Sequence, residues 1–331
     1  MNKKIIFFTS SFNGGGAEIQ LRKLFEILQS NFECIYLTAK DDKKSSNLVG
    51  FNKKKTIFSI FKLLKKILIF NPDILISTLP TPNVMNAFLK KIRVVNYKCV
   101  VRIANYNLEL KTTKFIIKNA DVVFFNSTEN LELYQNRYPH LAKKFFYLNN
   151  IVESNISVLK KTSSSNVRAL TLSRIVRNKG LDLLIDVMNE LDNNMVSLDI
   201  YGNGPELGNL RKKNRNPGVS FCGKINNTSN LWNNYDLFIL PSRKEGLSNS
   251  LLEAQLNNTF SIASDCKTGN KEVINLTKNG CLFESENLED LKAKILNFVT
   301  NKYTITESHF LIKNSYSKEI ALKVLRSSLS I

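Results

Sequence analysis

Residues 241–254 read Pro-Ser-Arg-Lys-Glu-Gly-Leu-Ser-Asn-Ser-Leu-Leu-Glu-Ala and predict a strand that passes through a glycine turn into a helix. The strand is the apolar run Leu237–Pro241, and the helix begins near Ser248. The backbone amides of Gly246, Leu247 and Ser248 then lie at a helix N-terminus, where such amides bind phosphate oxygens. The segment therefore predicts a phosphate site at the end of a strand.

Two carboxylates flank this turn. Glu245 is expected on the loop, and Glu253 about one and a half turns into the helix. Carboxylates in these places can accept hydrogen bonds from sugar hydroxyls, one from a ribose and the other from a transferred sugar. The alternative is that Ser248 only caps the helix and that both glutamates are solvated, because such caps are common.

Short apolar strands alternate with helical segments in both halves of the chain, which favours mainly parallel sheets built from β-α units. The elements predicted in the first half are strands Ile5–Ser10, Cys34–Thr38, Asp73–Ser77, Lys98–Ile103 and Val122–Asn126, and helix Glu18–Gln29. Those predicted in the second half are strands Val167–Ser173, Ser197–Tyr201, Val219–Cys222 and Leu237–Pro241, and helix Leu181–Leu191. Residues 153–166 lose apolar periodicity and are interpreted as a linker, and Tyr303–Ser330 is interpreted as helical.

A basic loop follows the strand Val167–Ser173. Arg174 and Lys179 are expected to project into the crevice at the end of the sheet. There a guanidinium and an ammonium would hold a diphosphate and stabilise it as a leaving group. The alternative is a solvated basic loop.

Together these motifs resemble the retaining GT-B glycosyltransferases of family 4, the glycosyl transferases group 1. The matching pieces are Asn13–Glu18, Arg174–Gly180, Tyr201–Pro205, Phe221–Lys224, the pair Glu245 and Glu253, and Asn279–Phe283. They follow the family's order over nearly the whole chain.

The resemblance implies an α/β protein of two Rossmann-like domains facing a cleft, with a C-terminal helix that packs back toward the N-terminal domain. The expected domains are an acceptor-binding domain over residues 1–155, a nucleotide-sugar domain over 156–305 and a helical tail over 306–331.

The resemblance also implies roles for individual residues. Arg174 and Lys179 would grip the diphosphate, Glu253 would bind the ribose hydroxyls, and Glu245 would face the donor sugar. The remaining donor contacts implied are the amides of Gly246, Leu247 and Ser248 near the sugar and phosphates, Gly223, Lys224 and Ile225 beside the base, and Gly15 and Gly16 from the opposing domain.

One family feature is missing. Many members carry a histidine just after the strand that here is Val100–Ile103, whereas this sequence has Arg102 and Asn105 in that region. Both are candidates for contacts with acceptor or donor. His140 and His309 match no family position and are expected to be structural or exposed.

The resemblance implies transfer on one face of the sugar, with the departing phosphate taking the acceptor proton, so that no dedicated protein base is needed. No Asp-x-Asp triplet occurs, and no metal or other cofactor is expected. A dinucleotide site is excluded because Ile19 stands where the third glycine of that fingerprint belongs.

Charge narrows the class of partner. The 331 residues carry a formal net charge of +19, and residues 1–150 hold 24 basic against 10 acidic side chains. An anionic partner is expected, and the N-terminal half would bind it. Five widely spaced cysteines are interpreted as reduced thiols of a cytosolic protein, and no stretch reaches the length of a membrane span.

The basic helix Thr56–Phe70 is a candidate membrane surface. It is predicted to place Ile57, Ile60, Phe61, Leu64 and Leu68 on one face. One interpretation is a helix that packs on the sheet and exposes its lysines to water. The other adds contact with an anionic membrane through Lys54, Lys55, Phe58, Phe61, Lys62, Lys65 and Lys66.

The resulting hypothesis is a retaining, metal-independent hexosyltransferase at the inner face of the cytoplasmic membrane. It would move a sugar from a nucleotide donor, expected to be UDP-linked, to a polyprenyl-diphosphate-linked glycan in bacterial O-antigen or capsule synthesis. Two alternatives are an epimerase or phosphorylase of the same shape and a basic nucleic-acid-binding protein. The latter is disfavoured, because the sequence holds no zinc finger or recognisable RNA-binding motif.

Overall fold

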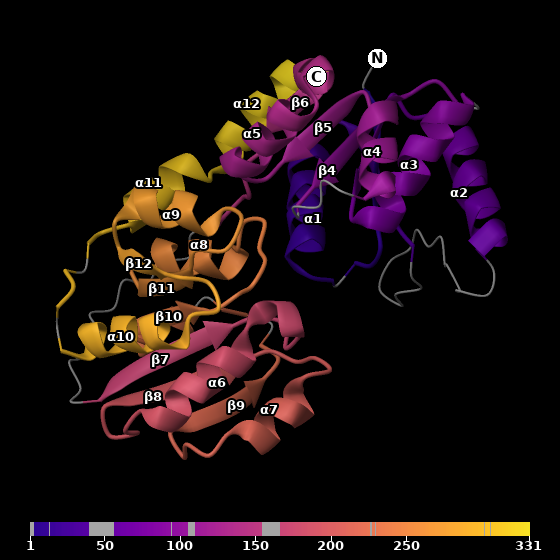
Figure 1. The fold of residues 1–331 in the computed structure, drawn as a ribbon. Coiled ribbons are helices and arrows are strands. Elements are labelled where there is room, and N and C mark those ends of the chain that lie inside the picture. The colour runs from indigo at the N-terminus through magenta and orange to yellow at the C-terminus, as the bar shows by residue number, and fades with distance from the viewer. Residues whose placement is uncertain are drawn as a thin grey trace. The chain divides into compact units, whose positions relative to one another are not determined.

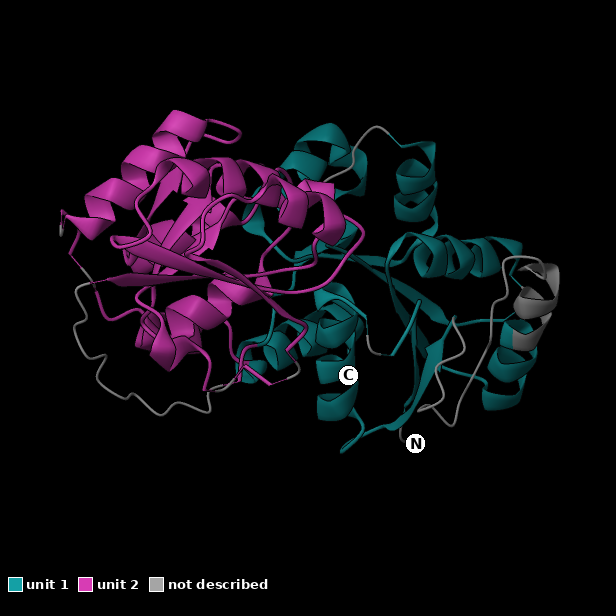
Figure 2. Cartoon of the chain, turned by 90° about the horizontal axis from the view of Figure 1, so that it is seen from below, with its two compact units in different colours: residues 1–151, 318–331 teal, residues 152–317 magenta. Residues whose placement is uncertain are grey.

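The computed structural model describes residues 3–12, 14–39, 56–93, 95–104, 110–153, 166–225, 227–228, 230–300, 302–304 and 306–331, with side chains in the first described helix after residue 55 starting at Leu63. The chain forms two compact units (Figure 2). Unit 1 comprises residues 1–151 and 318–331, and unit 2 comprises residues 152–317. The linker predicted over 153–166 falls almost entirely on residues 154–165, which lie outside the described residues.

Unit 1 is built on a six-stranded sheet in the order β2-β1-β3-β4-β5-β6, and its strands pair in parallel (Figure 1). The strands are β1 (Lys4–Thr9), β2 (Glu33–Thr38), β3 (Ile74–Thr78), β4 (Lys98–Ile103), β5 (Val122–Phe125) and β6 (Phe145–Tyr147). The five strands predicted for this half are present, and β6 is an addition.

Helices cover both faces of this sheet, as expected when parallel strands are buried on two sides. One face packs against α1 (Gly16–Leu28) and α12 (Lys318–Leu329). The other packs against α2 (Thr56–Phe70), α3 (Pro80–Ile92), α4 (Lys111–Asn119) and α5 (Thr128–Arg137), and a 3-10 turn, η1 (Pro139–Lys144), leads into β6. Ala321, Leu325 and Leu329 of α12 are buried in this core, so the prediction that the C-terminal helix packs back on the N-terminal domain is confirmed.

Helix α2 faces the core differently from the prediction. The structure buries Leu63 and Ile67 against the sheet, whereas Leu68, expected on the apolar face, is 56% exposed. The prediction is wrong for Leu68 because apolar residues surround most of this helix, and periodicity then does not define which arc is buried. Burial of Leu63 and Ile67 contributes about 1.5–3 kcal/mol each. Leu64, also expected on this face, is partly buried and packs against the core. The side chains of Ile57, Ile60 and Phe61 lie outside the described part.

Unit 2 repeats the architecture with the strand order β12-β11-β10-β7-β8-β9. Its strands are β7 (Val167–Leu172), β8 (Val196–Tyr201), β9 (Val219–Gly223), β10 (Leu237–Leu240), β11 (Phe260–Ser264) and β12 (Gly280–Phe283). One face packs against α6 (Leu181–Glu190), α7 (Leu207–Lys213) and α10 (Leu288–Val299), and the other against α8 (Asn249–Leu256), α9 (Asn270–Thr277) and α11 (His309–Ser315). Two 3-10 turns complete the unit, η2 (Arg177–Lys179) and η3 (Trp232–Asn234).

Strands β11 and β12 are absent from the sequence-based prediction. The segment predicted as helical over Tyr303–Ser330 becomes two helices, α11 in unit 2 and α12 in unit 1, and its described residues before His309 (303–304 and 306–308) are not helical. Among the described residues, no helix combines the length and apolarity required to cross a bilayer.

The strand order of unit 2 places the site. From β7 the chain moves outward to β8 and β9, then returns to the other side of β7 with β10, β11 and β12. The loops that follow β7 and β10 therefore meet at the point where the order reverses. In open parallel sheets, ligands bind at such switch points, outside the carboxyl ends of the strands.

Candidate active site

The two loops at the switch point are packed against each other. The β7–α6 loop (residues 173–180) ends at Gly180, which has a φ of +64°, and a methyl carbon added there would lie 1.9 Å from the Pro241 carbonyl oxygen. The Arg243 amide of the β10–α8 loop (residues 241–248) donates to the Asn178 carbonyl at 2.9 Å. Only glycine combines this backbone conformation with this approach, so the contact depends on Gly180.

An ion pair joins the two loops. The Lys179 ammonium donates to Glu245 Oε1, and the Ser242 hydroxyl donates to the same oxygen at 2.7 Å. The two charged side chains are only 18% and 10% exposed. The sequence analysis assigned Lys179 to the diphosphate and Glu245 to the donor sugar. The structure brings them together and pairs them with each other.

Arg174 is an unpaired positive charge at the site. It lies two residues after the end of β7 and is exposed. Within the described ranges, its guanidinium has no hydrogen-bonding or ionic partner. Because Lys179 is neutralised by Glu245, Arg174 and Arg177 are the described cations of this loop whose side chains have no partner and are available to an incoming anion.

The turn predicted to bind phosphate is held by hydrogen bonds and close packing. Ser248 is the N-cap of α8, and its hydroxyl accepts from the Leu251 amide at 3.3 Å. From the other side, the Thr268 amide donates to the Glu245 carbonyl at 3.2 Å. A methyl carbon on Gly269, whose φ is +85°, would lie 1.9 Å from the Gly246 carbonyl oxygen. The helix cap is thus real, and the phosphate contact of these amides stays a prediction.

Glu253 accepts a hydrogen bond from a protein hydroxyl in this structure. It lies in α8, and one carboxylate oxygen accepts from the Thr228 hydroxyl at 3.0 Å. Thr228 belongs to the segment that begins with Gly223, Lys224 and Ile225, the residues predicted beside the base. The carboxylate is thus bonded to a hydroxyl from that segment, and the ribose contact of Glu253 stays a prediction.

The glycine-rich turn of unit 1 is closed by its own glutamate. One oxygen of Glu18 accepts from the Ser11 amide and hydroxyl, and the other accepts from the Gly15 amide at 2.6 Å. That amide has an acceptor inside unit 1, and Gly16 is the first residue of α1. The predicted contact of Gly15 and Gly16 with the donor stays a prediction.

Arg102 is buried at the end of β4. It is 1% exposed and donates to the Asn150 side chain, while its Nε and Nη1 have no partner in the part of the chain that the structure describes. Burial lowers the pKa of this guanidinium to about 10. Arg102 does not face solvent in unit 1, and Asn105 lies outside the described residues. His140 is exposed and His309 Nδ1 contacts the Leu256 carbonyl oxygen at 2.8 Å, as expected for histidines without a site role.

Few of the predicted membrane residues are described. Lys54, Lys55 and the side chains of Phe58, Phe61 and Lys62 lie outside the described part. Lys65 is exposed and Lys66 is half-buried. The structure exposes apolar side chains on two helices: Leu68 and Ile69 on α2, and Phe88 and Ile92 on α3.

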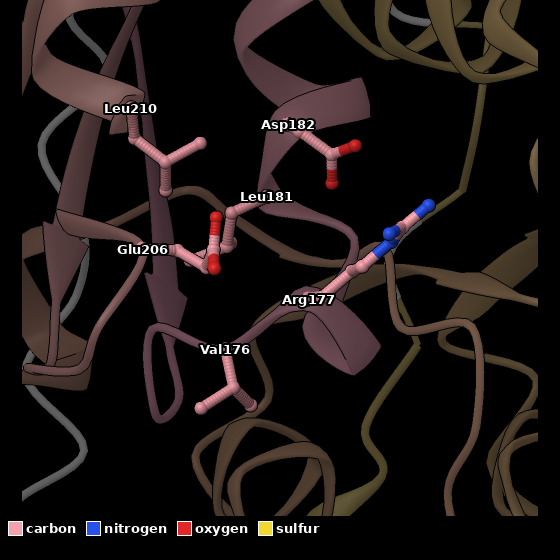
Figure 3. A pocket seen from close by; sticks show the side chains of 6 residues that line it. All are labelled: Val176, Arg177, Leu181, Asp182, Glu206 and Leu210. Carbon is pink, nitrogen blue, oxygen red and sulfur yellow. The ribbon is translucent and has the colours of Figure 1, made fainter. Parts of the chain in front are cut away.

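A separate pocket of about 280 Å³ lies on the α6 and α7 side of the β7–α6 loop (Figure 3). Its lining residues are Val176, Arg177, Leu181, Asp182, Glu206 and Leu210. Figure 3 shows the Arg177 side chain extending away from Glu206. None of the predicted donor contacts lines this pocket, so it is not the predicted donor site. No cluster of three metal-ligating side chains occurs among the described residues.

Two units, each built on a six-stranded parallel sheet, are the arrangement of the GT-B fold. The structure aligns with that of Anabaena Alr3699/HepE in complex with UDP-glucose at a TM-score of 0.80, with 17% identity over 99% of this chain and 100% of that one. The prediction of a GT-B fold is confirmed.

The family comparison agrees with the fold. The family model described as "Glycosyl transferases group 1" matches residues 166–301, which lie within unit 2. The chain is 28% identical over 207 residues to the poly(ribitol-phosphate) alpha-N-acetylglucosaminyltransferase of Staphylococcus aureus, covering 60% of this chain but 41% of that protein. The predicted resemblance to this family is confirmed.

A second relative covers more of both chains. It is the N-acetylgalactosamine-N,N'-diacetylbacillosaminyl-diphospho-undecaprenol 4-alpha-N-acetylgalactosaminyltransferase of Campylobacter jejuni, 25% identical over 319 residues, covering 86% of this chain and 87% of that protein. The similarity therefore extends through both units.

Proposed function

We propose that this protein is a retaining glycosyltransferase that moves a sugar from a UDP-linked donor to a lipid-linked glycan during bacterial surface polysaccharide synthesis. The observation that carries the proposal is the charge arrangement at the switch point of unit 2. There the paired Lys179 and Glu245 lie in two loops locked together, beside the unpaired Arg174.

The mechanism follows from where negative charge develops. When the bond between sugar and diphosphate breaks, charge accumulates on the leaving phosphate, and preorganised cations lower the barrier. Arg174 and Lys179 supply that positive charge, which is why the reaction proceeds without a metal ion. As Lys179 turns to the phosphate, Glu245 is left to accept a hydrogen bond from a hydroxyl of the transferred sugar.

The donor is held by its ribose and its base. Glu253 accepts hydrogen bonds from the ribose hydroxyls in the place where it now accepts from Thr228. Residues 223–225 lie beside the base, and the amides of residues 246–248 lie beside sugar and phosphates. The departing phosphate takes the acceptor proton on the face that it leaves, so that configuration is retained. No side chain need then act as a general base at the position of the missing histidine.

The acceptor class rests on relatives and on charge. The Campylobacter relative is named for a diphospho-undecaprenol substrate. In this chain, residues 1–150 hold 24 basic against 10 acidic side chains. Exposed Lys65 beside exposed Leu68 and Ile69 on α2 suits an anionic leaflet, because apolar side chains enter the interface while lysines meet the headgroups. The protein thus works at the inner face of the cytoplasmic membrane and binds no nucleic acid.

Donor binding tests the proposal. A thermal-shift screen of nucleotide-sugars selects the donor, and titration calorimetry then compares wild type with Glu253→Ala. Loss of hydrogen bonds to a charged group costs about 1.5–3 kcal/mol, or roughly a 10- to 100-fold weaker affinity. The control is Glu289→Ala, an exposed glutamate in the first turn of α10, which should leave the affinity unchanged. Unchanged donor affinity in Glu253→Ala would contradict the assignment.

Two further measurements separate the alternatives. Product analysis with and without acceptor lipid distinguishes a transferase from an epimerase or phosphorylase, which would convert its substrate without the lipid. Pelleting with anionic and neutral liposomes, compared with oligonucleotide binding at matched salt, tests the membrane surface. Binding to anionic liposomes is expected to fall for Lys65→Glu, and preferential binding to the oligonucleotide would contradict the proposal.

A further inference from the structure

Arg243 ties together three segments around the site. Its Nη1 and Nη2 donate to the two carboxylate oxygens of Asp182 at 2.7 and 2.8 Å. Nη1 also donates to the Arg177 carbonyl oxygen at 2.8 Å, and Nε donates to Glu286 at 2.8 Å. Every nitrogen of the guanidinium is thus bonded, and we call this set of contacts the Arg243 clamp.

The strongest part of the clamp is the contact with Asp182. A two-pronged guanidinium–carboxylate pair fixes both distance and orientation, which a single ammonium contact does not. Asp182 also lies in the first turn of α6, where the helix dipole favours a negative charge. The hydrogen bond from Arg243 is the largest cause that lowers the pKa of Asp182. The Glu286 side chain is largely exposed, so that contact is screened and contributes less.

The Arg243 clamp lies next to Lys179 and Glu245 in the chain but bonds neither side chain. Arg243 lies two residues before Glu245, and its partners on the β7–α6 loop, Arg177 and Asn178, directly precede Lys179. The two residues that form the central ion pair therefore stand on backbone that Arg243 connects. The clamp adds to the packing of Gly180 on Pro241.

The proposed reaction requires a connection between the two loops besides the Lys179–Glu245 ion pair, and the Arg243 clamp supplies it. Without donor, the Lys179 ammonium is bonded to Glu245. A donor diphosphate competes for that ammonium, and the ion pair that joins the loops is then weakened. Arg243 bonds none of the groups for which the diphosphate competes, so its contacts persist through the exchange.

We propose that Arg243 is a positioning residue for sugar transfer, which holds the β7–α6 loop in register with Glu245 while Lys179 exchanges Glu245 for the donor diphosphate. The inference rests on the proposed function, because it requires a diphosphate at Lys179. Loss of the clamp leaves flexible Arg174 and Lys179 able to reach the diphosphate. The same loss lets the β7–α6 loop shift relative to Glu245, and the transfer step depends on that register. The variant therefore loses kcat more than nucleotide affinity.

The first experiment separates kcat from affinity. The variants are Arg243→Met, which removes the charge, and Arg243→Lys, which keeps the charge but cannot form the two-pronged contact. UDP affinity is measured by calorimetry. The kcat is measured as release of UDP from the sugar nucleotide selected by thermal shift, with water as acceptor. The control is Lys213→Met, which breaks a half-exposed ion pair with Asp186 that joins α7 to α6.

Arg243→Met should lower kcat about 10- to 100-fold, the scale of a displacement of about 1 Å at a reacting centre. Its UDP affinity should stay within about three-fold of wild type, Arg243→Lys should be intermediate, and Lys213→Met should match wild type. A wild-type kcat in Arg243→Met overturns the proposal. So does a loss of UDP affinity as large as the loss of kcat, because Arg243 would then act on binding.

Amide hydrogen exchange gives a readout that needs no substrate. Exchange in residues 173–182 and 241–248 should rise in Arg243→Met and not in Lys213→Met. Unchanged exchange overturns the proposal, and so does faster exchange with an unchanged kcat, since Arg243 would then be merely structural. If Arg243→Met does not fold, Asp182→Asn takes its place with an expected kcat loss of about 3- to 10-fold, on the scale of one weakened charge-assisted hydrogen bond.

Failure of the proposed function is distinguishable from failure of this inference. The former shows in the wild type, which would neither bind UDP nor release it from any sugar nucleotide. The latter shows as a missing difference between Arg243→Met and an active wild type.

Discussion

At the switch point of unit 2, Lys179 and Glu245 pair across two loops beside the exposed Arg174. At the carboxyl edge of the sheet in unit 1, Glu18 instead bonds its own loop and Arg102 is buried beside Asn150. The two sheets share one architecture of six parallel strands with helices on both faces.

The difference teaches that topology places a site and that residue chemistry decides what the site can do. Both sheets reverse their strand order and thereby offer a crevice. Among the described residues, the loops at that point in unit 2 present charged side chains that an incoming anion can rearrange. In unit 1 the Gly15 amide is bonded internally and the Arg102 guanidinium is shielded from solvent.

The largest effect is expected for Lys179→Met. It removes a cation from the leaving phosphate and leaves Glu245 without its partner. Loss of one such stabilising contact costs about 10²- to 10³-fold in kcat. The measurement is UDP release from the selected sugar nucleotide. Lys292→Met, which breaks an ion pair with Glu190 in the same unit, is the control and should keep the wild-type rate. A rate within three-fold of wild type for Lys179→Met would remove Lys179 from the mechanism.

A smaller effect on stability is expected for Gly180→Ala. The added methyl group meets the Pro241 carbonyl oxygen at 1.9 Å in a backbone conformation that disfavours side chains. Urea unfolding should show a loss of about 1–3 kcal/mol for this variant, the cost of a strained left-handed residue. Gly208→Ala is the matched control, because Gly208 lies in α7 with no atom within 4 Å of an added methyl carbon. Equal stability of the two variants would show that the loops are not packed as described.

The smallest effect, a change in unfolding free energy, is expected for Arg102→Met at the carboxyl edge of the sheet in unit 1. Arg102→Met replaces a buried cation, two of whose donors have no partner among the described residues, with an apolar side chain of similar length. Such replacements of buried charge are often neutral or stabilising, so the change in unfolding free energy should be within about 1 kcal/mol of zero or favourable. A loss of several kcal/mol in the free energy of urea unfolding would mean that Arg102 makes a further stabilising contact. The contrast between the carboxyl edges of the two sheets would then weaken.

Much of the fold was predictable because buried parallel strands leave continuous apolar runs. Lys98–Ile103 is both the predicted and the observed β4. Strand β11 was missed because two serines interrupt the apolar residues of Phe260–Ser264, although every residue of it is buried. Strand β6 has three residues, too few for a pattern. Helix α2 is apolar on several sides, so its buried arc depends on tertiary packing rather than on periodicity.

The candidate site was predictable as a set of loops but not as a set of contacts. Spacing placed Lys179 and Glu245 at the ends of two strands. It could not show that they pair, because 66 positions separate them. The sequence analysis gave no role to Arg243 or Asp182, and nothing in the sequence indicated that Thr228 bonds Glu253. Such contacts depend on which strands become neighbours, and the order of β10 beside β7 emerges only from the folded sheet.

The most direct test of the account is a hydrogen-exchange footprint of UDP over the whole chain. The account predicts slower exchange in residues 173–180, 241–248 and the segment that contains Thr228, with no comparable change around Gly208 in α7. Protection confined to the pocket lined by Val176 and Glu206, or absent from the two switch-point loops, would contradict the placement of the donor site in unit 2.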